Sequence, residues 1–264
     1  MVASPEFRLL FVADVVGSPG REAVKALLPG LREEFKPHLV VLNGENSAGG
    51  FGLTVATIKE LKSAGADVIT TGNHVFDQRE FVPLLDQQER VVRPANYPPG
   101  APGIGHCVVE ADGEEVLVMN LMGRINLLDI DDPFRKADEI LAEQAEGRIT
   151  ICDFHAEATS EKVAMGWYLD GRVAAVLGTH THVPTADQRV LPSGTAFCTD
   201  VGMVGPRDSV IGMDAENVLK RFLTAVPQKW RVAEGPVTFN SALVSIDRQT
   251  RRATSIQRVD RLHN

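Results

Sequence analysis

Short apolar runs alternate with helical patterns of apolar and polar positions through the first half of the chain. Three apolar runs predict buried strands, at Phe7–Ala13, Leu39–Asn43 and Asp67–Thr71. A segment with helical periodicity follows each of them, at Arg21–Phe35, Thr54–Ala64 and Arg79–Leu85. Pro29 predicts a break in the first helix, whereas Thr54 and Gly65 are expected to begin and end the second. This alternation predicts βαβ units around a largely parallel sheet.

The second half of the chain predicts strands and helices in a less regular order. A hairpin is predicted around the turn Asp112-Gly113, from Val108–Glu110 and Val116–Asn120. Other apolar runs predict strands, at Ile149–Phe154, Val173–Leu177, Ala196–Thr199 and Ala242–Ile246. Further helices are predicted at Phe134–Ala145, Glu161–Leu169 and Ala215–Val226. The Pro/Gly-rich segment Pro94–Pro102 predicts a loop inside a domain, so residues 1–264 are expected to form one domain.

Composition narrows the range of partners. The chain has 264 residues, of which 44% are hydrophobic and 23% are charged, as is typical of globular proteins. Its formal net charge of −8 argues against binding of long nucleic acid, because such binding uses basic surface to neutralise phosphates. A small phosphorylated substrate is compatible with this charge, since bound divalent cations can supply local positive charge.

The three cysteines, Cys107, Cys152 and Cys198, are far apart in the sequence and form no metal-binding or redox motif. We expect them to be buried small hydrophobic residues, and their odd number fits a reducing compartment. The N-terminal sequence does not have the pattern of a secretory leader, and no apolar run approaches membrane-spanning length. A cytoplasmic protein without a membrane partner is therefore expected.

Polar side chains gather where the predicted strands end. The residues concerned are Asp14, Glu45, Asn46, Asn73, His74, His155, His180 and His182. Taken singly, a carboxylate could cap a helix, a carboxamide could stabilise a turn, and a histidine could be a hydrogen-bonded core residue. In open α/β sheets, however, ligands bind beyond the carboxyl ends of the strands. Carboxylates, carboxamides and imidazoles recurring at successive strand ends therefore indicate a metal site.

The stretch LGTHTHVP places His180 and His182 directly after an apolar run. If this segment is extended, alternate side chains point to one side and both imidazoles can face the same point. Carboxylate oxygens and imidazole nitrogens without thiolates suit iron, manganese or zinc better than copper(I) or an iron–sulfur cluster. The ligands are numerous enough for two ions that share a carboxylate.

These residues resemble a known family. Asp14, the turns Gly44-Glu45-Asn46 and Gly72-Asn73-His74, His155 and the segment Gly178–His182 resemble the motifs of calcineurin-like metallophosphoesterases. The stretches ENSAGGFG (45–52), DFHAEATSEK (153–162), GTHTHVPTAD (178–187) and TDVGMVGP (199–206) resemble the YmdB-type branch, a bacterial 2′,3′-cyclic nucleotide phosphodiesterase family. The broad superfamily has Asp-x-His and Gly-Asp where this chain has Asp14-Val15-Val16 and Gly44-Glu45. The YmdB-type branch shares both changes.

The resemblance implies a fold and a ligand set. The fold would be a four-layer α/β/β/α sandwich with two mixed sheets. Asn46 would complete the first metal site, where the superfamily histidine is missing. The first ion would bind Asp14, Glu45, Asn46 and His182, and the second would bind Glu45, Asn73, His155 and His180. Glu45 would bridge two divalent or trivalent ions, with iron or manganese expected and zinc also compatible.

The function that the resemblance implies is hydrolysis of small cyclic nucleotides of the 2′,3′ class. A metal-activated hydroxide would attack the phosphodiester, with His74 as general acid or as a group that orients the substrate. Two alternatives stay open: a metal-dependent amidohydrolase, which also uses His-x-His, and a ligand-sensing regulatory metalloprotein with low turnover. In the amidohydrolase class the pair sits on the first strand of a (β/α)₈ barrel, and its late position here argues against that class.

Several secondary features accompany this interpretation. The segment GSPGREA, with Ser18, Gly20 and Arg21, could form a phosphate-binding turn before a helix. The glycines of ENSAGGFG are expected to serve backbone geometry. Glu157 and Arg207 are candidates for lining the pocket, although their spacing does not decide it. The resemblance also suggests a homo-oligomer, with a small phosphodiester as the substrate partner.

Overall fold

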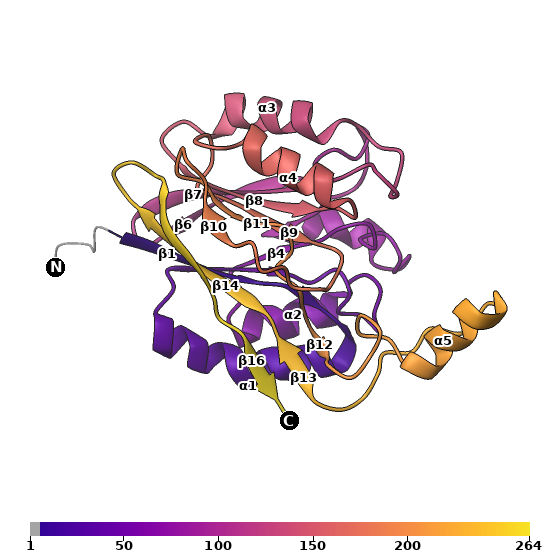
Figure 1. Cartoon of the computed structure of the whole chain (residues 1–264). Coiled ribbons are helices and arrows are strands. Elements are labelled where there is room, and N and C mark those ends of the chain that lie inside the picture. The colour runs from indigo at the N-terminus through magenta and orange to yellow at the C-terminus, as the bar shows by residue number, and fades with distance from the viewer. Residues whose placement is uncertain (1–5) are drawn as a thin grey trace.

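Residues 6–264 are described by the computed structural model, and two six-stranded sheets lie at the centre of the fold (Figure 1). The strand order of the first sheet is β15 (Ala253–Arg258), β14 (Ser241–Asp247), β1 (Glu6–Val12), β3 (Leu39–Asn43), β4 (Val68–Thr70) and β5 (Val91–Val92). In this sheet β1, β3, β4 and β5 are parallel, whereas β14 runs antiparallel to β1. The predicted βαβ units account for the parallel half of this sheet.

The second sheet is also mixed. Its order is β10 (Arg189–Val190), β11 (Ala196–Cys198), β9 (Ala175–Thr179), β8 (Ile149–His155), β7 (Glu114–Met122) and β6 (His106–Ala111). The four central strands are parallel, and the edge strands β10 and β6 are antiparallel to their neighbours. The predicted hairpin is confirmed as β6–β7, with positive φ at Asp112 (48°) and Gly113 (79°) in its turn. A small third sheet has the order β16 (Arg261–His263), β13 (Val237–Phe239), β12 (Met203–Pro206) and β2 (Asp14–Val15).

Three hydrophobic cores separate four layers. Helices α1 (Gly17–Phe35) and α2 (Val55–Ala64) pack on the first large sheet around a core that includes Leu28 and Leu61. The two large sheets pack face to face through residues such as Phe11 and Ile151. Helices α3 (Pro133–Gln144) and α4 (Thr159–Tyr168) cover the second sheet (Figure 1). The predicted α/β/β/α sandwich is confirmed, and in residues 6–264 this layering replaces the (β/α)₈ barrel of the amidohydrolase alternative.

Helix α1 differs from its prediction. It begins at Gly17 and continues through Pro29, so the predicted break is wrong. Pro29 is exposed, and the buried side of the helix is formed by residues such as Val24, Leu28 and Leu31. The hydrogen bond that proline cannot donate is therefore missing on the solvent side, where water can bind the freed carbonyl. Burial of the apolar side holds the helix together across this residue.

Helix α2 agrees with its prediction, whereas the next one is wrong. The Thr54 side chain accepts a hydrogen bond from the Thr57 backbone N–H, and Gly65 ends α2 with a φ of 116°. Instead of the helix predicted at Arg79–Leu85, the chain forms the 3₁₀ helix η1 (Val82–Gln87). Of its six residues only Leu85 is buried, so no apolar stripe stabilises a longer helix.

Helix α5 (Ala215–Thr224) projects away from the sandwich (Figure 1). Its outer positions Phe222 and Leu223 are 80% and 84% exposed. Among the described helices none has the length and apolar character needed to cross a membrane. The three cysteines are free thiols, with Cys152 and Cys198 buried as predicted and Cys107 half-buried.

Candidate metal centre

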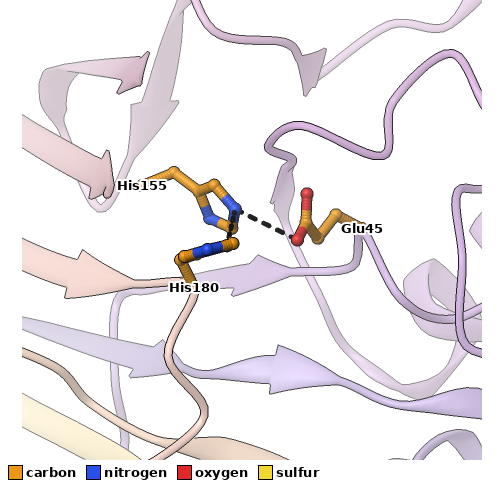
Figure 2. Close-up of side chains that lie close together, drawn as sticks. All are labelled: Glu45, His155 and His180. Atoms are coloured by element: carbon orange, nitrogen blue, oxygen red, sulfur yellow. Dashed lines mark hydrogen bonds and ion pairs between the residues drawn. The ribbon is translucent and has the colours of Figure 1, made fainter. Parts of the chain in front are cut away.

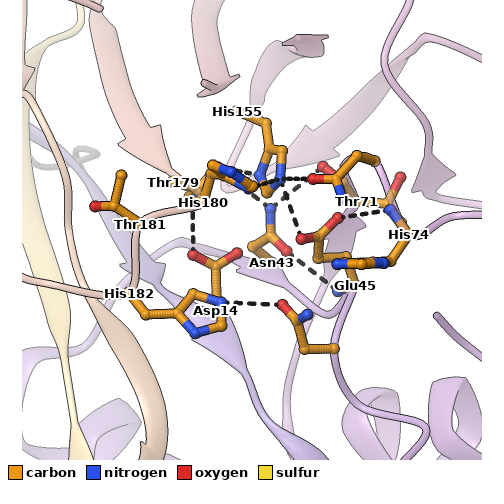
Figure 3. Close-up of polar contacts among 12 residues, drawn as sticks. Asp14, Asn43, Glu45, Thr71, His74, His155, Thr179, His180, Thr181 and His182 are labelled. Atoms are coloured by element: carbon orange, nitrogen blue, oxygen red, sulfur yellow. Dashed lines mark hydrogen bonds and ion pairs between the residues drawn. The ribbon is translucent and has the colours of Figure 1, made fainter. Parts of the chain in front are cut away.

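The polar residues singled out in the sequence come together at one edge of the sandwich (Figure 3). Asp14 begins β2, His155 ends β8, and the turns after β3 and β4 carry Glu45 and His74. The segment after β9 supplies the last two histidines. The carboxyl ends of strands from both large sheets meet here, as the strand-end pattern predicted.

Glu45, His155 and His180 form the tightest part of the centre (Figure 2). Nε2 of His155 lies 3.1 Å from Oε1 of Glu45 and 3.1 Å from Nδ1 of His180. The Asn73 Oδ1 atom lies 3.0 Å from the same His155 nitrogen. One carboxylate oxygen, one amide oxygen and one imidazole nitrogen therefore converge on Nε2 of His155.

Glu45 and His155 are both buried, and each changes the pKa of the other. Burial alone would raise the pKa of Glu45 and lower that of His155, but each group stabilises the charge of the other. Their contact lowers the pKa of Glu45 to about 2 and raises the pKa of His155 to about 9. Burial and the neighbouring His155 charge lower the pKa of His180 to about 3. The lowered pKa of His180 favours the neutral imidazole, which is the form that binds metals, whereas His155 would have to lose a proton to solvent before it could bind one.

Asp14, Asn46 and His182 form the other part of the centre. Nε2 of His182 lies 3.2 Å from Oδ1 of Asn46, and Nδ1 lies 2.9 Å from the Ile211 carbonyl oxygen. The Ile211 carbonyl can therefore fix the orientation of this ring. Oδ2 of Asp14 accepts a hydrogen bond of 3.0 Å from the His180 backbone N–H, which links the two parts.

The donor atoms fit metal ions. Ligand atoms of Glu45, His155 and His180 all lie within 4.8 Å of one another. Asp14 is fully buried, and its Oδ1 atom has no hydrogen-bond partner among the described residues. Burial raises the pKa of Asp14 well above its usual range, and the neighbouring Glu45 charge adds to this effect. A cation beside Asp14 would stabilise its carboxylate, and oxygen and nitrogen donors suit iron, manganese or zinc.

The backbone of the His-x-His pair is not extended, so that part of the sequence interpretation is wrong. Strand β9 ends at Thr179, and φ is 101° at His180 and 63° at His182. Residues other than glycine rarely adopt positive φ, because this backbone conformation costs them about 1–3 kcal/mol each. Both rings nevertheless turn into the centre (Figure 3). Left-handed turns, and not strand alternation, bring the two imidazoles together.

Gly72 provides the space in which the cluster forms. A Cβ atom at this position would lie 2.3 Å from Oε2 of Glu45 and 2.3 Å from Nε2 of His155. Neither side chain can move away without leaving its buried partners. The glycine before Asn73 is thus required by the close approach of the strand end to the cluster.

His74 stands beside the cluster and not within it. Its backbone N–H donates a hydrogen bond of 3.2 Å to Oε2 of Glu45, while its ring lines the pocket. The Asp77 carboxylate lies 2.7 Å from Nδ1 of the ring, and the Phe51 ring contacts it edge-on. These two contacts can hold the imidazole in a fixed orientation, as expected for a group that handles a proton.

A buried network supports His155 from behind. Nδ1 of His155 lies 2.9 Å from the Thr179 hydroxyl, which donates a hydrogen bond of 2.7 Å to Asp153. Asp153 also accepts hydrogen bonds from Asn43 and Thr70. If Nδ1 donates to the hydroxyl, Nε2 of His155 is left to face the cluster.

Glu45, Asn46, His74, His180 and His182 line a pocket of about 280 Å³. The rest of its wall is apolar and consists of Phe51, Val210, Ile211, Met213, Val218, Phe222 and Trp230. Segment 210–230, which includes α5, therefore supplies a wall that the sequence interpretation did not identify.

The secondary candidates from the sequence divide into two groups according to their contacts. Oε2 of Glu157 lies 3.1 Å from Nε2 of His180, so this side chain reaches the centre. Arg207 instead pairs with the exposed Asp208. Ser18 and Gly20 lie in the first turn of α1 and not in a separate turn before it. Positive φ angles at Gly49, Gly50 and Gly52 confirm their role in backbone geometry.

Asp77, the Ile211 carbonyl and the network of Asp153 and Thr179 were missed by sequence reasoning. The spacing of three residues between His74 and Asp77 is a detectable signal, because residues three apart within a turn can contact each other. A backbone carbonyl such as that of Ile211 leaves no signal in side-chain chemistry. Asp153 stands within an apolar strand, where an isolated carboxylate indicates a buried hydrogen-bonding role.

Comparisons with known proteins agree with this geometry. The chain is 53% identical to a 2′,3′-cyclic-nucleotide 2′-phosphodiesterase of Bacillus subtilis (strain 168), over 96% of both chains. The crystal structure of a hypothetical protein from Thermus thermophilus has a TM-score of 0.93 and 44% identity, and covers 98% of this chain and 100% of its own. That of a novel phosphatase from Mycoplasma pneumoniae has a TM-score of 0.93 and 32% identity, and covers 97% of this chain and 94% of its own.

The match to a protein family covers nearly the whole chain. Residues 10–259 match the family model described as YmdB-like protein. This span contains every candidate metal ligand and the pocket wall. The chain therefore belongs to the YmdB-like family.

Proposed function

We propose that this protein is a di-metal phosphodiesterase that hydrolyses small cyclic nucleotides of the 2′,3′ class. The observation that carries the proposal is the cluster of Glu45, His155 and His180, of which Glu45 and His180 line a pocket. A relative that is 53% identical over 96% of the chain is a 2′,3′-cyclic-nucleotide 2′-phosphodiesterase, which supports the substrate class. The reaction that we propose for this site is therefore hydrolysis of a phosphoric diester.

In this proposal the two parts of the centre hold one ion each. Asp14, Asn46 and His182 bind the first, and Asn73, His155 and His180 bind the second, with Glu45 shared between them. The contact between His182 and Asn46 supports the first set, and the convergence of Asn73, His180 and Glu45 on His155 supports the second. Iron or manganese fits these ligands, and zinc is compatible with them.

Bound ions would neutralise charge on the phosphoryl oxygens and lower the pKa of the attacking water. The protein side chains position the remaining chemistry. His74, oriented by Asp77, protonates the ribose oxygen that leaves phosphorus.

The pocket can bind the nucleoside part of the substrate. Polar side chains of the centre line it together with Phe51, Phe222 and Trp230, which contribute aromatic surface. A nucleobase can pack on such a surface while the cyclic phosphate reaches the metal centre, since stacking on aromatic side chains is favourable for every base. A pocket of about 280 Å³ suits a mononucleotide rather than a long strand.

Metal analysis and a substrate panel test the proposal together. The protein loaded with manganese or iron should hydrolyse 2′,3′-cyclic nucleotides, and Glu45→Ala should lose both ions and this activity. The panel includes a phosphomonoester and an amide, so that a different reaction class would be recognised. A ligand-sensing protein would instead bind cyclic nucleotides tightly with negligible turnover. Full metal content in Glu45→Ala would show that Glu45 is not the shared ligand.

A further inference from the structure

The motif segments ATSEK and TDVG meet behind the metal centre. Lys162 of α4 and Asp200, which follows β11, form an ion pair of 2.5 Å between Nζ and Oδ2. Lys162 is 1% exposed and Asp200 is fully buried. Burying a charged pair costs desolvation energy, so the pair by itself is a poor source of stability. Its location calls for a reason other than simple core packing.

The reason lies in what else Asp200 binds. Its Oδ2 atom accepts hydrogen bonds from the Thr181 backbone N–H at 3.1 Å and from the Thr181 hydroxyl at 2.7 Å. Its Oδ1 atom accepts a hydrogen bond of 2.8 Å from the Gly202 backbone N–H. Lys162 and Thr181 therefore converge on one carboxylate oxygen, and the other oxygen is anchored by the chain that follows.

Thr181 is the residue between the two histidines that have positive φ. His180 and His182 adopt φ angles of 101° and 63°, and such angles persist only where surrounding contacts enforce them. Two hydrogen bonds from the intervening residue to a buried carboxylate are contacts of this kind. The His180 backbone N–H is held as well, by Asp14. The backbone between the rings is thus fixed by Asp200 from outside the metal centre and by Asp14 from within it.

We infer that Asp200, with its charge balanced by Lys162, is a positioning residue that holds Thr181 and thereby aims His180 and His182 at the two metal sites. This inference rests on the proposed function, because it takes both histidines as metal ligands. Supporting residues of this type typically contribute about 10–100-fold to metal affinity. Asp200 acts through the backbone of the ligand segment and not through contact with a metal.

Substitutions at Thr181 test the inference without leaving a buried charge unpaired. Thr181→Val removes the hydroxyl that binds Asp200, and we expect Mn²⁺ affinity to fall about tenfold. Thr181→Ser keeps the hydroxyl and should bind Mn²⁺ as the unchanged protein does. Free Mn²⁺ measured by electron paramagnetic resonance during titration gives the affinity. Asp200→Asn should lower the affinity further, because its single amide oxygen replaces a carboxylate that serves Lys162, Thr181 and Gly202.

Thr195→Val is the matched control. Thr195 is fully buried and directly precedes β11, at the opposite end of this strand from Asp200. Its hydroxyl donates a hydrogen bond to the Val173 carbonyl oxygen. It should lower the melting temperature without changing Mn²⁺ affinity. Equal affinity of Thr181→Val and the unchanged protein would overturn the inference while leaving the proposed function intact. Absence of binding of Mn²⁺, iron and Zn²⁺ by the unchanged protein would instead overturn the proposed function.

Discussion

At the scale of single residues, the centre depends on the missing side chain of Gly72 as well as on the proposed ligands. Gly72→Ala adds one carbon, which would lie 2.3 Å from both Glu45 Oε2 and His155 Nε2. Because both partners are buried, we expect this variant to lose bound metal although every proposed ligand is retained. Elemental analysis of the purified protein measures the loss.

Gly30→Ala is the control for that prediction. In α1 a Cβ atom at Gly30 meets nothing within 4 Å. Alanine is favoured over glycine inside helices by about 1 kcal/mol, so this variant should be fully loaded with metal and slightly more stable. Normal metal content in Gly72→Ala would show that the cluster can rearrange around the added carbon.

His74 allows proton transfer to be separated from metal binding. His74→Asn should keep full metal content, since the ring of His74 is not a proposed ligand. Its turnover of 2′,3′-cyclic nucleotides should fall about 10²–10⁴-fold, the usual contribution of general acid catalysis. Its turnover of a p-nitrophenyl phosphodiester should fall far less, because a phenolate leaves without protonation. Steady-state rates on both substrates provide the measurement.

The two substrates also distinguish the other roles of His74. An equal loss on both would indicate that the ring positions the phosphate and does not donate a proton. Loss of metal from His74→Asn would show that the residue belongs to the coordination or its support. Asp77→Asn is the companion variant, because it keeps the size of the group 2.7 Å from Nδ1 while removing its charge.

At the scale of elements, α1 shows how packing overrides a local signal. Pro29 lies on its exposed side, and the buried residues on the other side keep the helix continuous. Pro29→Ala restores a backbone hydrogen bond and should raise the free energy of unfolding by about 1–2 kcal/mol, after the greater entropy of the unfolded chain is subtracted. Urea denaturation measures this gain. A lower midpoint would mean that the proline is needed for the local path of the helix.

The elements found from the sequence are those whose own residues determine them. All five residues of β3 are buried, and all but the last, Asn43, are apolar. This run of apolar residues predicts the strand directly. The start of α1 was missed because Gly17 and Gly20 are weak helix formers. Their positions depend on distant contacts: the Gly17 N–H donates to Asn46, and a Cβ at Gly20 would lie 2.4 Å from the Val204 carbonyl oxygen.

The same distinction applies to the site. The strand-end pattern predicted which side chains would meet, because parallel strands bring their carboxyl ends to one edge. The positive φ angles of His180 and His182 could not be predicted, since such angles are uncommon outside glycine and depend here on the tertiary contacts of Thr181 and Asp14. The Ile211 carbonyl and the apolar wall come from a segment far along the chain, and only the tertiary fold brings them to the centre.

At the scale of the whole molecule, the two metal sites should differ in affinity. The proposed second site has two imidazoles, those of His155 and His180, which converge closely with Glu45. The proposed first site has one imidazole, that of His182, because Asn46 stands where the resemblance to the superfamily leads us to expect a histidine. Chelator titration should therefore remove metal in two phases, with the site containing His182 emptied first. Metal content followed over time, in the unchanged protein and in His182→Ala, assigns each phase. Simultaneous loss of both ions, or earlier loss from the site of His155, would contradict this order.

The long-range pairing of β1 has a consequence for how a cell makes this protein. β1 leads into Asp14 and lies in the sheet between β3 and β14, which consists of Ser241–Asp247. During translation every proposed ligand has therefore been synthesised before the strand that completes the sheet beside β1 exists. A nascent chain carries the proposed ligands before the sheet that positions them is complete. We therefore expect the proposed centre to bind metal only after β14 has paired with β1.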